Sequence, residues 1–184
     1  MTLGSHENII NAFFRLASQK DYQKVTMMEI AQEAHLSRQA IYQKHFSSID
    51  QIIEEIHAIL YQDIYVTLKD FDPQKEHLNS FIARELLPRI YQHRDWLKVL
   101  HSSSLDLHWQ EFLYEQFHPI LAPYLSELAE DLQLSQAFLA DFLIRYYCSI
   151  IASWISQDLP MPPQYFAKYF LKLSDIPISH YFKF

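Results

Sequence analysis

Hydrophobic residues recur at spacings of three and four positions along most of this chain, which is the pattern of amphipathic helices. In residues 6–19, Ile9, Phe13 and Leu16 fall on one side of such a helix. Residues 49–71 keep an apolar stripe over roughly 30 Å at the helical rise per residue. The pattern therefore predicts an all-α fold of about nine helices.

The same spacing predicts further helices whose stripes are less regular, at residues 74–92, 95–102, 105–132, 135–157 and 163–173. Pro88, Pro119 and Pro123 lie inside these spans. Proline lacks a backbone N–H donor and clashes with the preceding turn, so we expect a kink or a break at each of them.

Two short helices with strong start signals follow the first helix. Thr26 is a good N-cap, and Glu29 three residues later completes a capping box. Ser37 is a second N-cap, and the helix that it opens runs from Arg38 to about His45. Two short capped helices behind a supporting helix predict a helix-turn-helix.

The second short helix carries the side chains that reading DNA requires. Arg bonds guanine at two atoms and Gln bonds adenine at two, whereas Lys meets phosphate. The helix supplies Arg38, Gln39, Gln43 and Lys44 for these roles. The N-caps Thr26 and Ser37 leave helix N-termini free to point at phosphates. The alternative is a surface helix whose polar face is only solvated.

Over residues 7–56 the sequence resembles the TetR family of bacterial transcription regulators. The resemblance is carried by Ile10, Ala12, Phe13, Tyr22, Thr26, Ile30-Ala31, Ala34, Leu36-Ser37, Ile41-Tyr42, His45-Phe46 and Asp50. It implies a helix-turn-helix DNA-binding domain at residues 1–48. It also implies a helical ligand-binding and dimerisation domain at residues 49–184.

The resemblance also implies roles for single residues. Contacts to the DNA backbone fall to Thr26, Tyr42 and either Lys44 or His45. Contacts to bases fall to Arg38, Gln39, Ala40 and Gln43.

Four positions depart from the family pattern. His35 stands where glycine is usual between the two short helices, and a left-handed backbone there costs a non-glycine residue about 1–2 kcal/mol. Asp21 replaces another common glycine. Tyr42 and Phe46 are one residue further apart than usual, so the recognition helix is either longer or ends in a bulged turn. Ile49 replaces a frequent lysine, which removes one expected phosphate contact.

The C-terminal two-thirds resembles the effector domains of low-GC Gram-positive members, chiefly at residues 94–100 and 146–154. The family implies dimerisation through the last two long helices, 135–157 and 163–173. Residues 138–155 are apolar over two adjoining helix faces, which indicates burial on more than one side. The expected dimer interface comprises Phe138, Phe142, Tyr146, Ile150, Trp154, Tyr165 and Tyr169. The alternative is a central core helix in a monomer.

Composition excludes several classes of protein. The 184 residues are 49% hydrophobic and 20% charged, which is typical of neither a disordered chain nor a membrane protein. The only glycine is Gly4, so phosphate-cradling loops and dinucleotide-binding turns are excluded. The single Cys148 rules out an internal disulfide. No secretory signal or uncharged apolar span is evident, so we expect a cytoplasmic protein.

Charge is divided unevenly along the chain. Residues 1–50 hold five basic and five acidic side chains, so the whole net charge of −7 lies in residues 51–184. A polyanion would therefore meet the N-terminal third, because the remainder repels it.

Aromatic residues make up 15% of the chain and gather between residues 91 and 147. The expected effector pocket, for an apolar or amphipathic molecule, comprises Trp96, Leu100, Trp109, Phe112, Phe117 and Tyr146. The alternative is a close-packed core. His101 with His108 lacks a third metal ligand, and the serines at 102–104 lack an oxyanion motif. We therefore expect no metal, no cofactor and no enzyme activity.

Two hypotheses of different classes follow. The leading one is a dimeric repressor of operator DNA that a small molecule releases. The alternative is an all-helical ligand-carrier or interaction protein that has lost DNA reading, which the neutral N-terminal third, His35 and Ile49 favour.

Overall fold

The structure, a computed structural model, describes residues 4–102 and 106–175. All regular structure in these two ranges is helical, which confirms the expected all-α fold. The helices are α1 (Ser5–Ala17), α2 (Met27–Glu33), α3 (Arg38–Lys44), α4 (Ile49–Lys69), α5 (Leu78–Phe81), α6 (Leu87–Gln92), α7 (Arg94–Ser102), α8 (Asp106–Leu121), α9 (Ser126–Leu132), α10 (Gln136–Ile155) and α11 (Pro163–Asp175).

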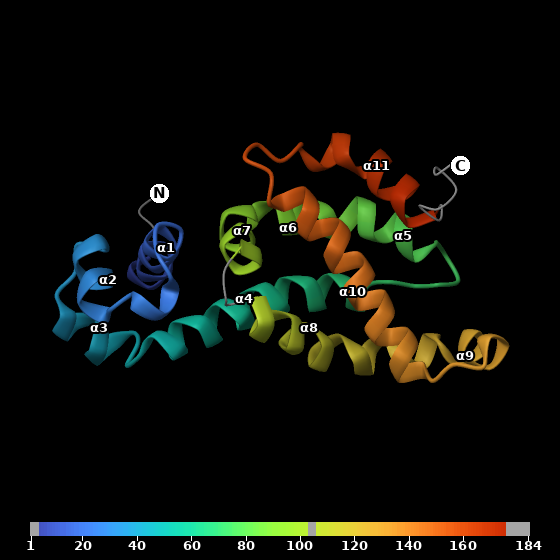
Figure 1. The fold of residues 1–184 in the computed structure, drawn as a ribbon, viewed down its shortest axis with the longest axis horizontal. Coiled ribbons are helices and arrows are strands. Elements are labelled where there is room, and N and C mark those ends of the chain that lie inside the picture. The colour runs from blue at the N-terminus through green and yellow to red at the C-terminus, as the bar shows by residue number, and fades with distance from the viewer. Residues whose placement is uncertain (1–3, 103–105, 176–184) are drawn as a thin grey trace.

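Figure 1 shows how these helices are arranged. Helices α1, α2 and α3 gather at one end of the molecule, and α4 runs from them along the remaining helices. Helix α10 crosses the molecule against α8 and α7, and α11 covers α5 and α6. Helix α9 lies at the end opposite α2 and α3. Helices α1, α2 and α3 therefore lie at the end of the molecule away from α9.

Proline and its neighbours divide two of the predicted helices. The span 74–92 becomes α5, a π-helical turn at Ile82–Leu86 and α6, with Pro88 in the first turn of α6. The span 105–132 breaks at Pro123, which lies in a 3-10 turn between α8 and α9. Pro119 stays inside α8. Proline costs little in the first turn of a helix, where its missing N–H would have no partner within the helix, and Pro88 of α6 and Pro123 of the 3-10 turn lie in such positions. The expected break does not occur at Pro119.

One hydrophobic core runs through both halves of the molecule, and Trp96 on α7 joins them. Its ring stacks on Phe14 of α1, with ring centroids 5.2 Å apart. Its indole N–H donates a hydrogen bond to Oδ1 of Asn11, also on α1, at 2.9 Å. The helix-turn-helix is therefore fixed to the C-terminal helical bundle by packing and by a directed hydrogen bond.

Helix α10 is, within the described residues, the one helix long and apolar enough to span a membrane by composition, with a mean hydropathy of 1.3. The apolar run of α10 is not free of charge, because Asp141 and Arg145 interrupt it. One face of α10 is buried against the bundle through Ala140, Ile144 and Ile155. A central helix of a globular protein has this same composition.

Candidate DNA interface and ligand pocket

The turn between α2 and α3 holds the left-handed residue that the sequence predicts. His35 has a φ of 55°, a region that favours glycine, so the structure confirms the strained position. The turn is closed by a hydrogen bond from the Leu36 N–H to the Ala31 carbonyl at 2.9 Å. The Asn8 side chain on α1 also donates to the Ala34 carbonyl at 2.8 Å. These bonds hold the two helices at a set angle despite the missing glycine.

Helix α3 presents the predicted DNA-reading side chains to solvent. Ser37 caps it by accepting a hydrogen bond from the Ala40 N–H at 3.1 Å, and Ile41 anchors it in the core. Ala40 and His45 are half-buried. The exposed residues of the predicted set are Ser37, Arg38, Gln39, Tyr42, Gln43 and Lys44. The periodicity of the sequence therefore predicts the outward face of this helix correctly.

The extra residue before Phe46 is absorbed in a bulged turn rather than in a longer helix. The His45 and Phe46 N–H groups both donate to the Ile41 carbonyl, at 2.9 and 3.1 Å. The wider turn lets Phe46 reach the core, where it is buried. Because the bulge follows Lys44, it leaves the direction of the first turn of α3 unchanged.

Arg38 and Tyr42 are coupled along one face of α3. The Arg38 guanidinium lies 5.2 Å from the centre of the Tyr42 ring, and its Nη2 is 3.5 Å from the phenol oxygen. These are cation–π geometry and a long hydrogen bond. A residue expected to read a base and one expected to hold phosphate are thus not independent.

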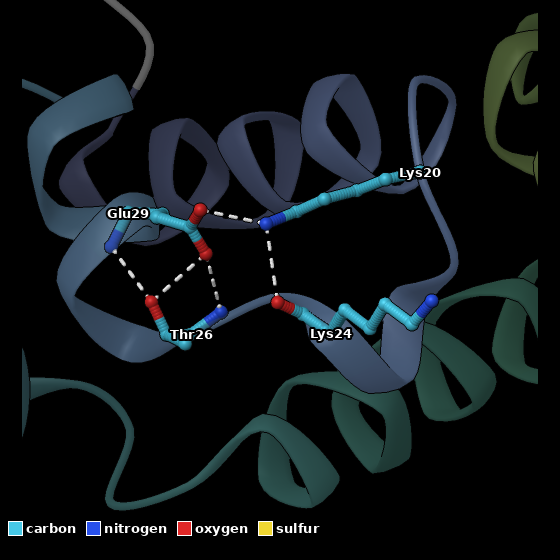
Figure 2. A network of polar contacts seen from close by, with 4 residues as sticks. All are labelled: Lys20, Lys24, Thr26 and Glu29. Atoms are coloured by element: carbon cyan, nitrogen blue, oxygen red, sulfur yellow. Dashed lines mark hydrogen bonds and ion pairs between the residues drawn. The ribbon is translucent and has the colours of Figure 1, made fainter.

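Thr26 does more to build the start of α2 than to offer its hydroxyl to DNA. Figure 2 shows this hydroxyl accepting from the Glu29 N–H at 3.3 Å and donating to the Glu29 carboxylate at 2.9 Å. Lys20 completes the network by donating to Glu29 at 2.6 Å and to the Lys24 carbonyl at 3.1 Å. The expected phosphate contact of Thr26 would have to compete with Glu29.

We expect this capping network to weaken in acid. Hydrogen bonds from Lys20, and next from Thr26, hold the pKa of Glu29 below its ordinary value of 4.5. A carboxylate with a lowered pKa in the folded state stabilises the protein fully above that ordinary value, and less as pH falls through the folded value. In urea unfolding between pH 6 and 3, Glu29→Gln should remove part of the acid loss of stability.

The matched control is Glu127→Gln on α9, whose side chain is exposed. This change should leave the acid dependence as it is in the unaltered protein. Equal pH profiles for Glu29→Gln and the unaltered protein would contradict the assignment of this network.

Ion pairs explain how the N-terminal third can have zero net charge and still present basic side chains without carboxylate partners. Lys20 is bound to Glu29, and Arg15 to Glu33. Among the described residues, Lys24, Arg38 and Lys44 have no carboxylate partner. The paired charges cancel locally, so α3 keeps a positive edge within a domain of zero net charge.

An apolar cavity of about 120 Å³ lies inside the helical bundle. Its walls come from α4, the segment 78–90, α7, α8 and α10. They comprise Ile64, Leu68, Leu78, Ile82, Leu86, Ile90, Leu97, His101, Trp109, Leu113, Phe117, Leu121, Leu143, Ile144, Tyr147, Cys148 and Ile151. The cavity is the natural place for an apolar ligand.

Two of the six predicted pocket residues, Trp109 and Phe117, line this cavity. The other four do not line this cavity. Trp96 faces α1, and Leu100 is buried in the core outside the cavity walls. Phe112 stacks on His57 with centroids 4.9 Å apart, and Tyr146 donates to the Leu173 carbonyl on α11.

The cavity residues that the sequence did not predict are of two kinds. Some are the chain neighbours of predicted residues, and the others lie on α4 and on the segment 78–90. Tyr147 takes the place of Tyr146, and Leu97 that of Trp96, because the next residue on a helix faces a different side. Tyr147 donates to Oδ1 of Asn79 at 2.6 Å. Burial raises the pKa of Tyr147 to about 12.

The predicted dimer residues divide into an exposed and a buried group. Phe138, Phe142, Tyr165 and Tyr169 are exposed, which suits a contact with another molecule. Tyr146 and Ile150 are half-buried. The prediction is wrong for Trp154, because α11 covers it.

The contacts of Trp154 show how complete this cover is. Its ring stacks on Phe166 at 4.3 Å and on Tyr91 at 5.7 Å. Its indole N–H donates to the Met161 carbonyl at 2.8 Å. With 2% of its surface exposed, Trp154 belongs to the core.

Comparison with known families agrees with this division of the molecule. A family model for "Bacterial regulatory proteins, tetR family" matches residues 9–56, from α1 into α4. A second model, "Transcriptional regulator C-terminal region", matches residues 76–175, which hold most of the cavity walls.

Similar proteins of known sequence or structure are regulators as well. The uncharacterized HTH-type transcriptional regulator YxbF of Bacillus subtilis (strain 168) is 22% identical over 173 residues, which is 89% of this chain. The chain spans 43% of that relative's length. A TetR transcriptional regulator from Streptococcus agalactiae 2603V has the same fold, with a TM-score of 0.61 at 20% identity, over 92% of each chain.

A more distant solved structure holds a ligand. FadR of Thermus thermophilus, a TetR family transcriptional repressor in complex with lauroyl-CoA, gives a TM-score of 0.50 at 19% identity. The match covers 91% of this chain and 92% of that one.

Proposed function

Because the chain belongs to the tetR family of bacterial regulatory proteins, we propose that it represses transcription by binding operator DNA as a homodimer until a small molecule releases it. The family consists of transcriptional regulators rather than enzymes. The observation that carries the proposal is the outward face of α3, where Arg38, Gln39 and Lys44 are exposed and unopposed by any acidic side chain on the same helix.

Each half of the chain has its own part in the proposal. Residues 1–48 read DNA, and residues 49–184 hold the effector and the partner subunit. Such a protein works in the cytoplasm, where its operator is. The effector type of low-GC Gram-positive members stays a prediction.

The exposed aromatic residues of α10 and α11 support the homodimer. A second copy that covers Phe138, Phe142, Tyr165 and Tyr169 removes a patch of apolar surface from water. Two-fold symmetry would then set two α3 helices about 34–36 Å apart, one turn of DNA. Light scattering at micromolar concentration should report twice the 22.0 kDa chain mass. A species of 22.0 kDa would refute the homodimer.

Helix α7 supports the coupling of effector to DNA. Leu97 lines the cavity, and the adjacent Trp96 contacts α1 of the helix-turn-helix. An effector that favours a different position of α7 therefore favours a different position of α1, and it shifts the population away from the DNA-binding form. The apolar walls favour an effector with an apolar part, in keeping with the lauroyl-CoA held by the Thermus protein.

A gel shift against the DNA that flanks the protein's own coding region tests the proposal. Sequence-specific retardation, abolished by Arg38→Ala combined with Gln39→Ala, is the expected result. No binding to this DNA or to a randomised operator library would favour the alternative, a helical ligand-carrier or interaction protein.

Lys44→Ala should weaken binding to all DNA alike. A phosphate contact carries no sequence information, so the ratio of specific to random affinity should stay constant. The slope of log affinity against log salt should fall by about one, because one counterion fewer is released. Binding to operator and to random DNA across a salt series measures both quantities.

Tyr42→Phe is the matched control, because it removes a hydroxyl without removing a charge. It should lower affinity on all DNA and leave the salt slope unchanged. A change in the affinity ratio for Lys44→Ala would contradict its phosphate assignment, whereas Tyr42→Phe also removes the contact of this hydroxyl with Arg38.

A further inference from the structure

A second hollow of about 560 Å³, unlike the first in chemistry, lies on the side of α10 that faces α7 and α8. Polar side chains line much of it, namely Tyr114, Asp141, Arg145, Ser149, Ser153 and Ser156. We call this hollow the polar groove. His101, Ile144 and Cys148 line both the groove and the apolar cavity, so the two hollows adjoin at these side chains.

Arg145 gives the groove a guanidinium of which only the Nε donor has a partner among the described residues. Its Nε donates to both carboxylate oxygens of Asp141, at 2.8 and 2.9 Å. In the part of the chain that the structure describes, Nη1 and Nη2 have no partner, which leaves four N–H donors open. A carboxylate or a phosphate accepts two such parallel bonds.

The rest of the groove favours an anionic head group over a cationic one. The hydroxyls of Ser149, Ser153 and Tyr114 add donors around Arg145. Asp141 is the one carboxylate of the groove walls, and Arg145 already engages both of its oxygens. Because this ion pair is close to neutral, the groove suits a single anionic group better than a polyanion.

The cavity next to the groove limits the apolar part of the ligand. Its volume of about 120 Å³ is somewhat below that of a 150 Å³ apolar cavity known to bind benzene. In this conformation the cavity therefore admits one aromatic ring or a short alkyl chain.

We propose that the effector is a small amphiphile whose ring or short chain fills the apolar cavity and whose carboxylate or phosphate binds Arg145 in the polar groove. The proposal rests on the proposed function only in taking the apolar cavity as the effector site. Phe138 and Arg145 lie seven residues apart on α10, as do Phe142 and Ser149, so the groove borders the exposed aromatic face of this helix.

Binding of 4-phenylbutyrate to the purified full chain, measured by calorimetry, tests the head group. The neutral probe is 4-phenylbutan-1-ol, which has the same ring and linker. The carboxylate should bind roughly ten-fold more tightly than the alcohol, because it adds charge-assisted hydrogen bonds at a partly exposed site. A third probe, 4-phenylbutyl phosphate, distinguishes carboxylate from phosphate as the preferred anion. An alcohol that binds as tightly as both anions would overturn the proposal.

Two variants of the ion pair should act in opposite directions. Arg145→Gln should weaken 4-phenylbutyrate about ten-fold and leave the alcohol unchanged, whereas Asp141→Asn should strengthen it by removing a competing acceptor. If the ion pair only stabilised the fold, each variant would change the affinity for the acid and the affinity for the alcohol by the same factor. That result would overturn the proposal. Both side chains are partly exposed, at 64% and 37%, so both variants should fold.

The apolar end is tested by Leu113→Phe, which fills the cavity wall. This variant should weaken the acid and the alcohol equally, and unchanged affinity in a variant of normal melting temperature would overturn the proposal. None of these measurements contains DNA. Operator binding by the chain without a probe is measured separately by the gel shift, so a chain that binds no DNA would refute the proposed function and leave the amphiphile site standing.

Discussion

Replacing Arg38 or Gln39 by alanine is expected to relax the choice of DNA sequence by about 1–3 kcal/mol for each base that the side chain no longer reads. Both side chains are exposed on the first turn of α3, directly after the Ser37 cap. Neither anchors the helix, which Ile41 does, so the free energy of unfolding should change by only about 0.5 kcal/mol. The effect on specificity is therefore expected without an effect on folding.

The measurement is the ratio of affinities for operator and for random DNA at fixed salt. Gln32→Ala, an exposed change on α2, is the control and should leave this ratio as it is. If Arg38→Ala and Gln39→Ala also leave the ratio unchanged, the assignment of base reading is wrong. The bulged turn would not explain that result, because it follows Lys44 and leaves the first turn of α3 unaffected.

Trp154→Ala is expected to lower the free energy of unfolding by about 3–5 kcal/mol. The ring is buried between Phe166 and Tyr91, and its N–H is satisfied by the Met161 carbonyl. The substitution leaves a cavity and an unpaired carbonyl at the place where α11 returns to α10. Urea unfolding of the purified protein measures the loss.

Phe142→Ala is the contrasting variant, because 53% of the Phe142 surface is exposed. It should leave the stability of the single chain nearly unchanged and should weaken the homodimer, as light scattering over a dilution series would show. A Trp154→Ala variant that is monomeric but has normal stability would indicate that Trp154 lies in the dimer interface. That result would contradict its place in the core.

The outward face of α3 could be predicted in detail because its determinants are local. Caps at Thr26 and Ser37 act over three residues, and the apolar spacing around Ile41 turns Arg38 outward within one helix. Even the cost at His35 and the extra residue before Phe46 are visible as departures from a pattern. Only the structure decided between a longer helix and a bulged turn, because that depends on Phe46 reaching the core.

The ligand site could be predicted only as a region rich in aromatic residues. Trp96 and Phe112 have the composition of pocket residues, yet their rings pack on α1 and on His57. A large part of the cavity wall comes from α4 and the segment 78–90, which no aromatic count singles out. Polarity does not tell which of two neighbouring residues, such as Tyr146 and Tyr147, turns inward.

The sequence by itself determined the all-α class, the helix-turn-helix and its exposed readers, since periodicity, caps and charge are properties of short segments. Only the tertiary structure decided which apolar faces meet. Helix α10 is apolar on adjoining sides, and the side that α11 covers is core at Trp154, while the side with Phe138 and Phe142 is exposed. The physical reason is that burial of a helix face depends on elements distant in sequence, and the residues of the face carry no record of which element covers them.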